Sequence, residues 1–108
     1  MEKGQEFLER LVRHGFTFRV FEAYPQHLGA VKYGCVVLLE VTTEGRWRQF
    51  SSAGYLMDGQ IGLLIERESH CEFVYKSARV AAEGKVMEDY QKFLKELNDL
   101  LAGLDASG

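Results

Sequence analysis

Two adjacent serines, Ser51 and Ser52, precede Asp58 in a stretch of the chain that is rich in glycine and polar side chains. Serine, histidine and aspartate are the residue types of nucleophilic hydrolysis, and His27 or His70 would have to complete such a set. A triad is defined by its geometry, and these residues lie in neither a sharp strand-to-helix elbow nor an oxyanion-forming turn. A hydrolase is therefore the least favoured function, and we assign no catalytic residue.

Cysteine and histidine could also do chemistry by binding a metal ion. Cys35 and Cys71 are far apart in the chain, and neither belongs to a CxxC-type spacing, which favours two thiols that pack as small hydrophobic groups. His70 and Cys71 are neighbours, and neighbours on a strand point to opposite faces, so the pair cannot easily supply two ligands to one ion. The glycines form neither a GxGxxG nor a GxxxxGK pattern. We therefore expect no metal site and no cofactor.

The length and the charge limit the class of protein. The chain has 108 residues, enough for one core, so we expect a single α+β domain over residues 1–108. The net charge of -3 provides no basic surface for a phosphate backbone, so nucleic acid is not an expected partner. The N-terminal residues are too charged for a signal peptide, and the longest apolar run, residues 35–39, is too short to cross a membrane. We expect a cytoplasmic protein.

Helical spacing marks both ends of the chain. Near the N-terminus, apolar residues recur with a helical period and Gly15 follows as a left-handed terminator, so the first helix should end at His14. Residues 85–101 are expected to form a longer second helix. Its apolar stripe consists of Val86, Tyr90, Phe93, Leu94, Leu97, Leu100, Leu101 and Leu104.

Between the helices, the apolar pattern changes to the period of two that is typical of strands. A first strand over residues 16–23 should end at Tyr24 and Pro25, because the residue before proline is held extended and proline cannot donate to a ladder. A loop over residues 26–29 is expected to follow. The second strand, over residues 33–42, is rich in β-branched side chains.

Residues 43–45 are expected to form a three-residue hairpin loop with glycine at its left-handed position. The register that this loop sets brings opposite charges together and places an aromatic residue opposite a β-branched one. The expected pairs are Val41 with Trp47, Glu40 with Arg48 and Leu38 with Phe50. A slip by one residue gives poorer pairs, so we favour this register.

A second hairpin signal, Asp-Gly at residues 58–59, predicts a hairpin over residues 55–65. Residues 51–54 should interrupt the long strand before it, because serine, alanine and glycine form strands poorly. A further strand is expected over residues 71–76. Residues 77–84 fit a strand, a loop or a helical turn, and we leave them open.

The expected fold is α+β, with an antiparallel meander of four to five strands between an N-terminal and a long C-terminal helix, both on one face of the sheet. The other face of the second strand carries Val36 and Leu38, and Phe50 joins them through the hairpin register. Apolar side chains would thus accumulate away from the helices. Exposed apolar patches of this kind usually mark a surface for a partner or a ligand.

Two non-enzymatic functions fit such a surface. The favoured one is a small interaction module that forms a homodimer through its apolar sheet face, or binds another protein there, because two-fold dimers require a self-complementary patch. The alternative is a domain that binds a small apolar molecule in a cavity where the sheet coils around the C-terminal helix. The expected lining of that cavity is Trp47, Phe50, Tyr55 and Tyr75. The candidate binding residues for the two functions together are Val36, Leu38, Trp47, Arg48, Phe50 and Tyr55.

Overall fold

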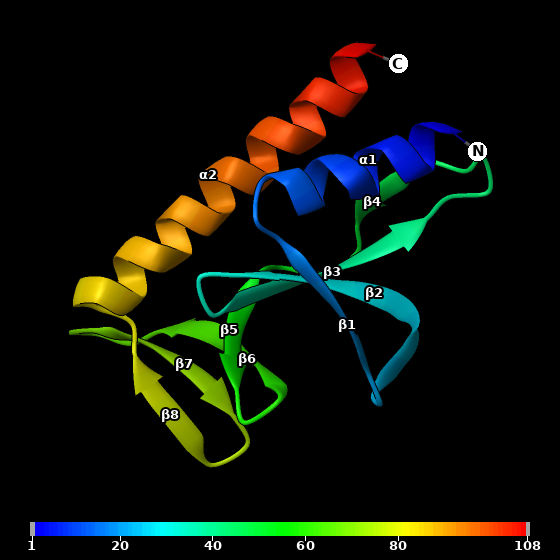
Figure 1. Ribbon diagram of the computed structural model, residues 1–108. Coiled ribbons are helices and arrows are strands. Elements are labelled where there is room, and N and C mark those ends of the chain that lie inside the picture. The colour runs from blue at the N-terminus through cyan, green and yellow to red at the C-terminus, as the bar shows by residue number, and fades with distance from the viewer. Residues whose placement is uncertain (1, 108) are drawn as a thin grey trace.

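The computed structural model describes the backbone of residues 2–107 and the side chains of residues 6–102. Within the described residues, a curled antiparallel sheet of eight strands lies between two helices in the chain (Figure 1). The elements are α1 (Glu2–Arg13), β1 (Thr17–Phe21), β2 (Tyr24–Lys32), β3 (Cys35–Val41), β4 (Trp47–Gln49), β5 (Gly54–Met57), β6 (Gln60–Glu66), β7 (Cys71–Tyr75), β8 (Ala78–Ala81) and α2 (Gly84–Ser107). The α+β class is confirmed, and the expected count of four to five strands is too low.

The first helix ends where its glycine predicts. Gly15 adopts a φ of 88°, in the left-handed region, and the amide of Phe16 donates to the carbonyl of Leu11 at 3.0 Å. This C-terminal geometry turns the chain back on the helix. As a result, Phe16 is buried in the core beside α1.

The loop expected at residues 26–29 is instead part of strand β2, so this prediction was wrong. β2 pairs with β1 on one side and with β3 on the other. Pro25 is tolerated because it lies near the start of the strand, before the pairing with β3 begins at Leu28. The turn into β3 consists of Tyr33 and Gly34, both with positive φ, so Tyr33 lies outside the strand to which its apolar character assigned it.

The register of the β3–β4 hairpin is confirmed. The paired residues are Glu40 with Arg48 and Val41 with Trp47. The amide of Phe50 donates to the carbonyl of Leu38 at 2.8 Å, which continues the same register. The hairpin therefore fixes which face of the sheet each of these side chains occupies.

A bend separates β4 from β5, as predicted, and both strands pair with β3. Leu38 faces Phe50, whereas Val36 faces Gly54, so a step of two residues along β3 corresponds to four residues on the facing side. The two extra residues form a bulge. Ser51 Oγ accepts a hydrogen bond from the amide of Leu38 at 3.3 Å, which satisfies that amide where the strand is interrupted.

The later elements follow their turn signals. Asp58 and Gly59 both have positive φ in the turn between β5 and β6, so the second hairpin is confirmed. Residues 77–84, whose sequence fits a strand, a loop or a helical turn, contain β8 and the start of α2. β1 and β8 end the main strand order, and β4 pairs with β3 alone.

Both helices cover the same face of the sheet and form the main core with it (Figure 1). The ring of Phe93 in α2 packs on Phe16, with 5.6 Å between the ring centroids. Glu96 in α2 accepts hydrogen bonds from Lys32 Nζ and from the hydroxyl of Tyr33, each at 2.5 Å, and so ties α2 to the β2–β3 turn. The side chain of Leu104, expected in the apolar stripe of α2, lies outside the described side chains.

The opposite face of the sheet, which we call the helix-free face, has a second and smaller core formed by Phe21, Val36 and Leu38. Val36 and Leu38 are 0% and 1% exposed. A bulge in β1 carries the ring of Phe21 over Gly29, where an added Cβ would lie 2.6 Å from a ring carbon. The expectation that Val36 and Leu38 form an exposed patch was therefore wrong.

The physical reason is the curl of the sheet. In β1, Arg19 reaches the β5–β6 turn, where a Cβ on Gly59 would lie 3.0 Å from its Nη2. Twist accumulates over many strands, so one end of a long sheet can turn over the other. A flat sheet of four or five strands would leave the second core in water, whereas this sheet encloses it.

Candidate functional site

The six predicted site residues do not share one surface. Two of them, Trp47 and Tyr55, pack against the main core on the helix side. The other four lie on the helix-free face, where Val36 and Leu38 are buried and Arg48 and Phe50 are exposed. The structure therefore brings together only part of the predicted set. It separates Trp47 and Tyr55 from Phe50, with which they were expected to line a cavity.

A hollow of about 330 Å³ lies on the helix-free face. Its lining is Tyr24, Leu38, Ser51, Ser52, Ile61, Leu63, Val74 and Tyr75. Half of these side chains are aliphatic and half carry a hydroxyl group. The volume is at the lower end of the ~300–1,000 Å³ that is common for ligand pockets.

Strand pairing and the β4–β5 bulge shape this hollow. Leu63 and Val74 face each other in the β6–β7 pairing and project to the same side. Ser51, in the bulge, accepts from the amide of Leu38 and donates to the carbonyl of Ser52 at 3.1 Å. Because the bulge departs from the plane of the sheet there, it leaves space above Leu38 that a regular strand would have filled.

Partly exposed apolar side chains lie at and around the hollow. They are Leu63, Phe50, Tyr24 and Ile65, with exposed fractions of 49%, 46%, 41% and 37%. Tyr24 and Leu63 line the hollow itself, Phe50 adjoins Ser51, and Ile65 continues the same face of β6. Apolar groups that meet water around a concave surface are the usual mark of a binding site.

Phe50 is held in place by a stack with His27, with 3.8 Å between the ring centroids. His27 Nε2 lies 3.7 Å from Glu40 Oε1, and the other oxygen of Glu40 accepts from Arg48 Nε at 2.5 Å. The Nδ1 atom of His27 is buried without a hydrogen-bond partner among the described residues. The stack and the ion pair together hold Phe50 in place, one residue before Ser51 of the hollow.

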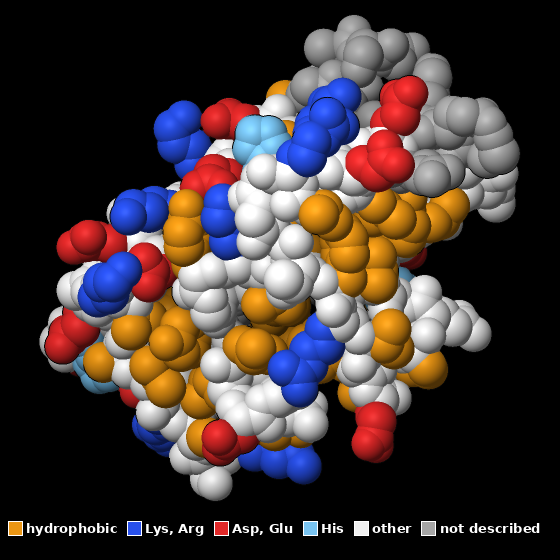
Figure 2. Space-filling view, viewed as in Figure 1, with side chains coloured by type: hydrophobic (Ala, Val, Ile, Leu, Met, Phe, Trp, Pro, Cys, Tyr) orange, Lys and Arg blue, Asp and Glu red, His pale blue; other side chains and the backbone are white. Residues whose placement is uncertain are grey.

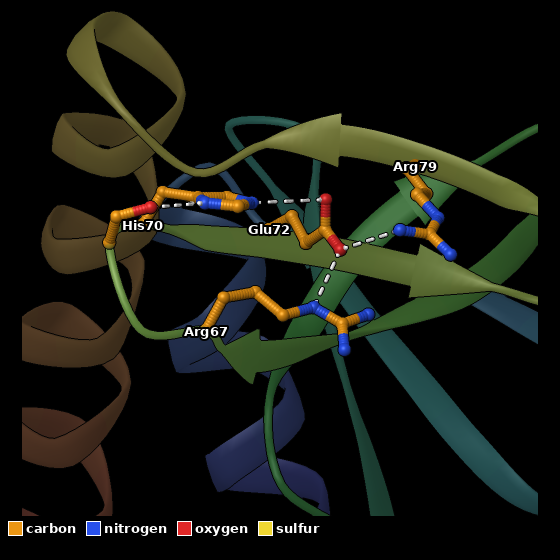
Figure 3. Close-up of polar contacts among 5 residues, drawn as sticks. Arg67, His70, Glu72 and Arg79 are labelled. Carbon is orange, nitrogen blue, oxygen red and sulfur yellow. Dashed lines mark hydrogen bonds and ion pairs between the residues drawn. The ribbon is translucent and has the colours of Figure 1, made fainter.

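At the other end of the same face, three basic side chains surround one buried carboxylate, that of Glu72 (Figure 3). Arg67 Nε and Arg79 Nη1 donate to Glu72 Oε2 at 2.9 and 3.2 Å, and His70 Nε2 lies 3.6 Å from Oε1. The hydrogen bond from Arg67, with the positive charge of Arg79, holds the pKa of Glu72 below its usual value. The cluster fixes the ends of β6, β7 and β8 relative to one another.

Ser69 adds a further contact to this cluster, with 3.4 Å between its Oγ and His70 Nδ1. The side chains of a serine, a histidine and a carboxylate thus contact one another in a row, as in a hydrolytic triad. The carboxylate of Glu72, however, is already shared with two guanidinium groups, which weakens its ability to stabilise a protonated His70. The arrangement is better suited to holding strands together than to activating Ser69.

The residues that the sequence offered for catalysis are placed differently. The hydroxyl of Ser51 is engaged by the backbone, and Asp58 lies in the β5–β6 turn near Arg19. Among the described residues, neither of these side chains shares a hydrogen bond or ion pair with His27 or His70. The structure assembles no nucleophile and base from this set.

The cysteines and the possible metal ligands are also separated. Cys35 is 0% exposed in the main core, and burial raises the pKa of its thiol to about 12. No three histidine, cysteine, aspartate or glutamate side chains within the described part of the chain are close enough to hold a metal ion. Neither helix, over the residues described, is long and apolar enough to span a membrane.

Sequence reasoning missed Tyr24, Ile61, Leu63 and Val74 as site residues. A signal for Leu63 was present, because Ile61, Leu63 and Ile65 alternate along β6 and the helices can cover only one face of a strand. Tyr24 had no such signal, because Pro25 after it suggested the end of a strand. Its place at the hollow depends on β2, which was not predicted.

The chain was compared with family models, with curated proteins and with solved structures, and none of them matches it. A fold alone does not imply a function. The function must therefore be argued from the geometry of the site.

Proposed function

We propose that this protein is a non-enzymatic binding module that holds a small, mainly apolar molecule in the hollow on its helix-free face. The observation that carries this proposal is the position of the hollow, on the side of the sheet that no helix covers, with Leu63 and Tyr24 partly exposed at its mouth. A ligand seated there removes apolar surface from water, which contributes ~25 cal/mol for each Å² buried.

The lining selects the chemistry of the ligand. Aliphatic side chains such as Leu63 and Val74 offer hydrophobic and dispersion contacts only, whereas the hydroxyl groups of Ser52 and Tyr24 can meet a polar edge. No lining residue carries a charge at neutral pH, so an ionised group would lose its hydration without gaining a partner. A volume of about 330 Å³ suits a compact molecule. We infer a neutral ligand of one or two rings, or a short aliphatic chain.

This proposal keeps the ligand-binding hypothesis but moves the site. The sequence hypothesis placed a cavity between the sheet and the C-terminal helix, where the main core now lies with Phe73, Tyr90 and Phe93. Tyr75 is common to both versions of the site. Val36 and Leu38 are too buried to meet a protein partner directly, so the helix-free face is better suited to a small molecule that enters the hollow.

Indole, a neutral molecule of two fused rings, is a suitable probe. Titrated into isotope-labelled protein, it should shift the backbone amide resonances of Ser51, Ser52, Leu63 and Val74 in a saturable way. The Leu63→Asp substitution places a carboxylate at the mouth of the hollow and should weaken indole binding by about tenfold or more. Val41→Asp is the matched control, because Val41 is 51% exposed at the far end of β3 and on the opposite face.

Two results would contradict the proposal. One is a set of indole-induced shifts that is spread over α1 and the main core rather than the hollow. The other is an equal loss of affinity in Leu63→Asp and Val41→Asp, since a specific site must distinguish them.

A further inference from the structure

A second apolar groove lies on another part of the molecule, between α1 and the edge strand β1. Figure 2 shows hydrophobic side chains gathered along the side of α1 that faces β1. The groove has a volume of about 420 Å³, and its lining is Leu8, Glu9, Val12, Arg13 and Phe18. Val12 is 56% exposed, and Val20 in β1 is 62% exposed. None of these residues lines the hollow on the helix-free face.

The edge of the sheet leaves this groove open on one side. β1 pairs with β2 only, so the backbone groups on its outer side have no strand partner in the sheet. Exposed edges and large apolar side chains beside them favour association with another chain. The remaining question is the chemistry of that chain.

The charges in the groove favour a second copy of this chain as the occupant. Glu9 and Arg13 both line it, four residues apart on α1 and therefore on one side of the helix. Neither side chain forms an ion pair among the described residues. A surface with one negative and one positive group at this spacing is complementary to its own copy in the reversed direction.

We propose that the groove is a homodimer interface, in which α1 packs antiparallel against α1 of a second copy. A two-fold axis places the same patch on both partners. Glu9 then faces the partner's Arg13, and Arg13 faces the partner's Glu9. In this register Val12 lies between the two ion pairs, close to the partner's Val12, and Leu8 extends the apolar contact just outside them.

This interface is separate from the ligand site. The sequence-based expectation of a homodimer placed the contact on the apolar sheet face, whereas Val12, Glu9 and Arg13 lie on a helix at the edge of the molecule. Dimer formation and indole binding can therefore fail independently. If the groove instead binds a different protein, the purified chain should be monomeric.

The first test is the molar mass in solution, measured by light scattering after size-exclusion chromatography over a series of concentrations. The wild-type chain should have twice the mass of one chain, and Val12→Glu should reduce it to the mass of a monomer. Val41→Glu is the matched control, since Val41 is a valine of similar exposure (51%) away from the groove, and it should remain dimeric. Far-ultraviolet circular dichroism checks that each variant is folded.

The second test uses the charges. Glu9→Arg and Arg13→Glu should each weaken the dimer by about tenfold or more, because each places like charges opposite each other twice. The double variant exchanges both charges and should restore the affinity. A monomeric wild type at every concentration, a dimeric Val12→Glu, or a double variant no better than the single ones would overturn the proposal. Indole shifts that persist in monomeric Val12→Glu would show that the ligand site does not require the dimer.

Discussion

The substitution Leu38→Ala distinguishes a curled sheet from a flat one. Leu38 is 1% exposed and packs with Phe21 and Val36, although it lies on the face that no helix covers. On a flat sheet the same side chain would be at the surface, where most substitutions change the free energy of unfolding by about 0.5 kcal/mol or less. In this structure, truncation removes buried methyl groups and leaves a cavity.

The size of the effect follows from the surroundings of Leu38. Truncation of a buried leucine to alanine costs ~2–5 kcal/mol, with the larger values where the site cannot collapse. The second core has few members, and the hollow borders Leu38, so water can reach part of the new space. We therefore expect a loss of about 2–3 kcal/mol, which corresponds to a fall in Tm of roughly 10 °C for a domain of this size.

Leu63→Ala is the matched control, because it changes the same residue type on the same face. Leu63 is 49% exposed, so its truncation should cost ~1 kcal/mol or less. Urea unfolding followed by the fluorescence of Trp47 and by circular dichroism gives both free energies, provided that the m-values agree. Equal losses of 1 kcal/mol or less in the two variants would refute the reasoning, because they would mean that Leu38 is as accessible as Leu63.

Two further predictions concern titration and reactivity. Because the pKa of Glu72 is lowered in the folded state, its stabilising effect should be complete above its unfolded pKa of about 4.3 and should be lost as the pH falls through the folded value. Urea unfolding of Glu72→Gln should thus show a deficit at neutral pH that shrinks in acid, and a deficit of constant size would argue against the role of Arg67 and Arg79. Iodoacetamide should modify Cys71, which is partly exposed, before Cys35, whose buried thiol stays protonated. Mass spectrometry of the protein modified under native conditions gives the order of reaction. Earlier modification of Cys35 would be inconsistent with its burial.

The elements that sequence reasoning placed correctly are those with local signals. Gly15 ends α1 because a glycine reaches the left-handed region without strain, and the glycine of the loop at residues 43–45 does the same at Gly45. The register of β3 and β4 then follows from the length of the loop and from the charges of Glu40 and Arg48. All of these signals lie within a few residues of the structure that they determine.

Strand β2 was missed because its signals are weak or misleading. Tyr33 adopts a φ of 57° in the β2–β3 turn, and a bulky residue rarely adopts such a conformation, so its side chain suggested a strand instead. Pro25 suggested a strand end but lies near a strand start. The pairing of β2 with two neighbours supplies the hydrogen bonds that outweigh both local preferences.

The exposure of the site residues could not be read from alternation. Alternation assigned Val36, Leu38 and Phe50 to one face, in agreement with the structure, but burial on that face depends on how far the sheet turns. The curl rests on contacts between distant residues, such as Arg19 with the turn at Gly59. Such contacts leave no periodic trace in the sequence.

The bend at residues 51–54 shows that geometry and function need not be competing explanations for an unusual segment. Serine, alanine and glycine there form a strand poorly, and the chain inserts two extra residues at that point. The hydroxyl of Ser51 replaces a lost backbone partner, so the interruption does not leave the amide of Leu38 unsatisfied. Because the bulge also opens the space above Leu38, the same weak β-formers that explain the bend create the wall of the proposed ligand site.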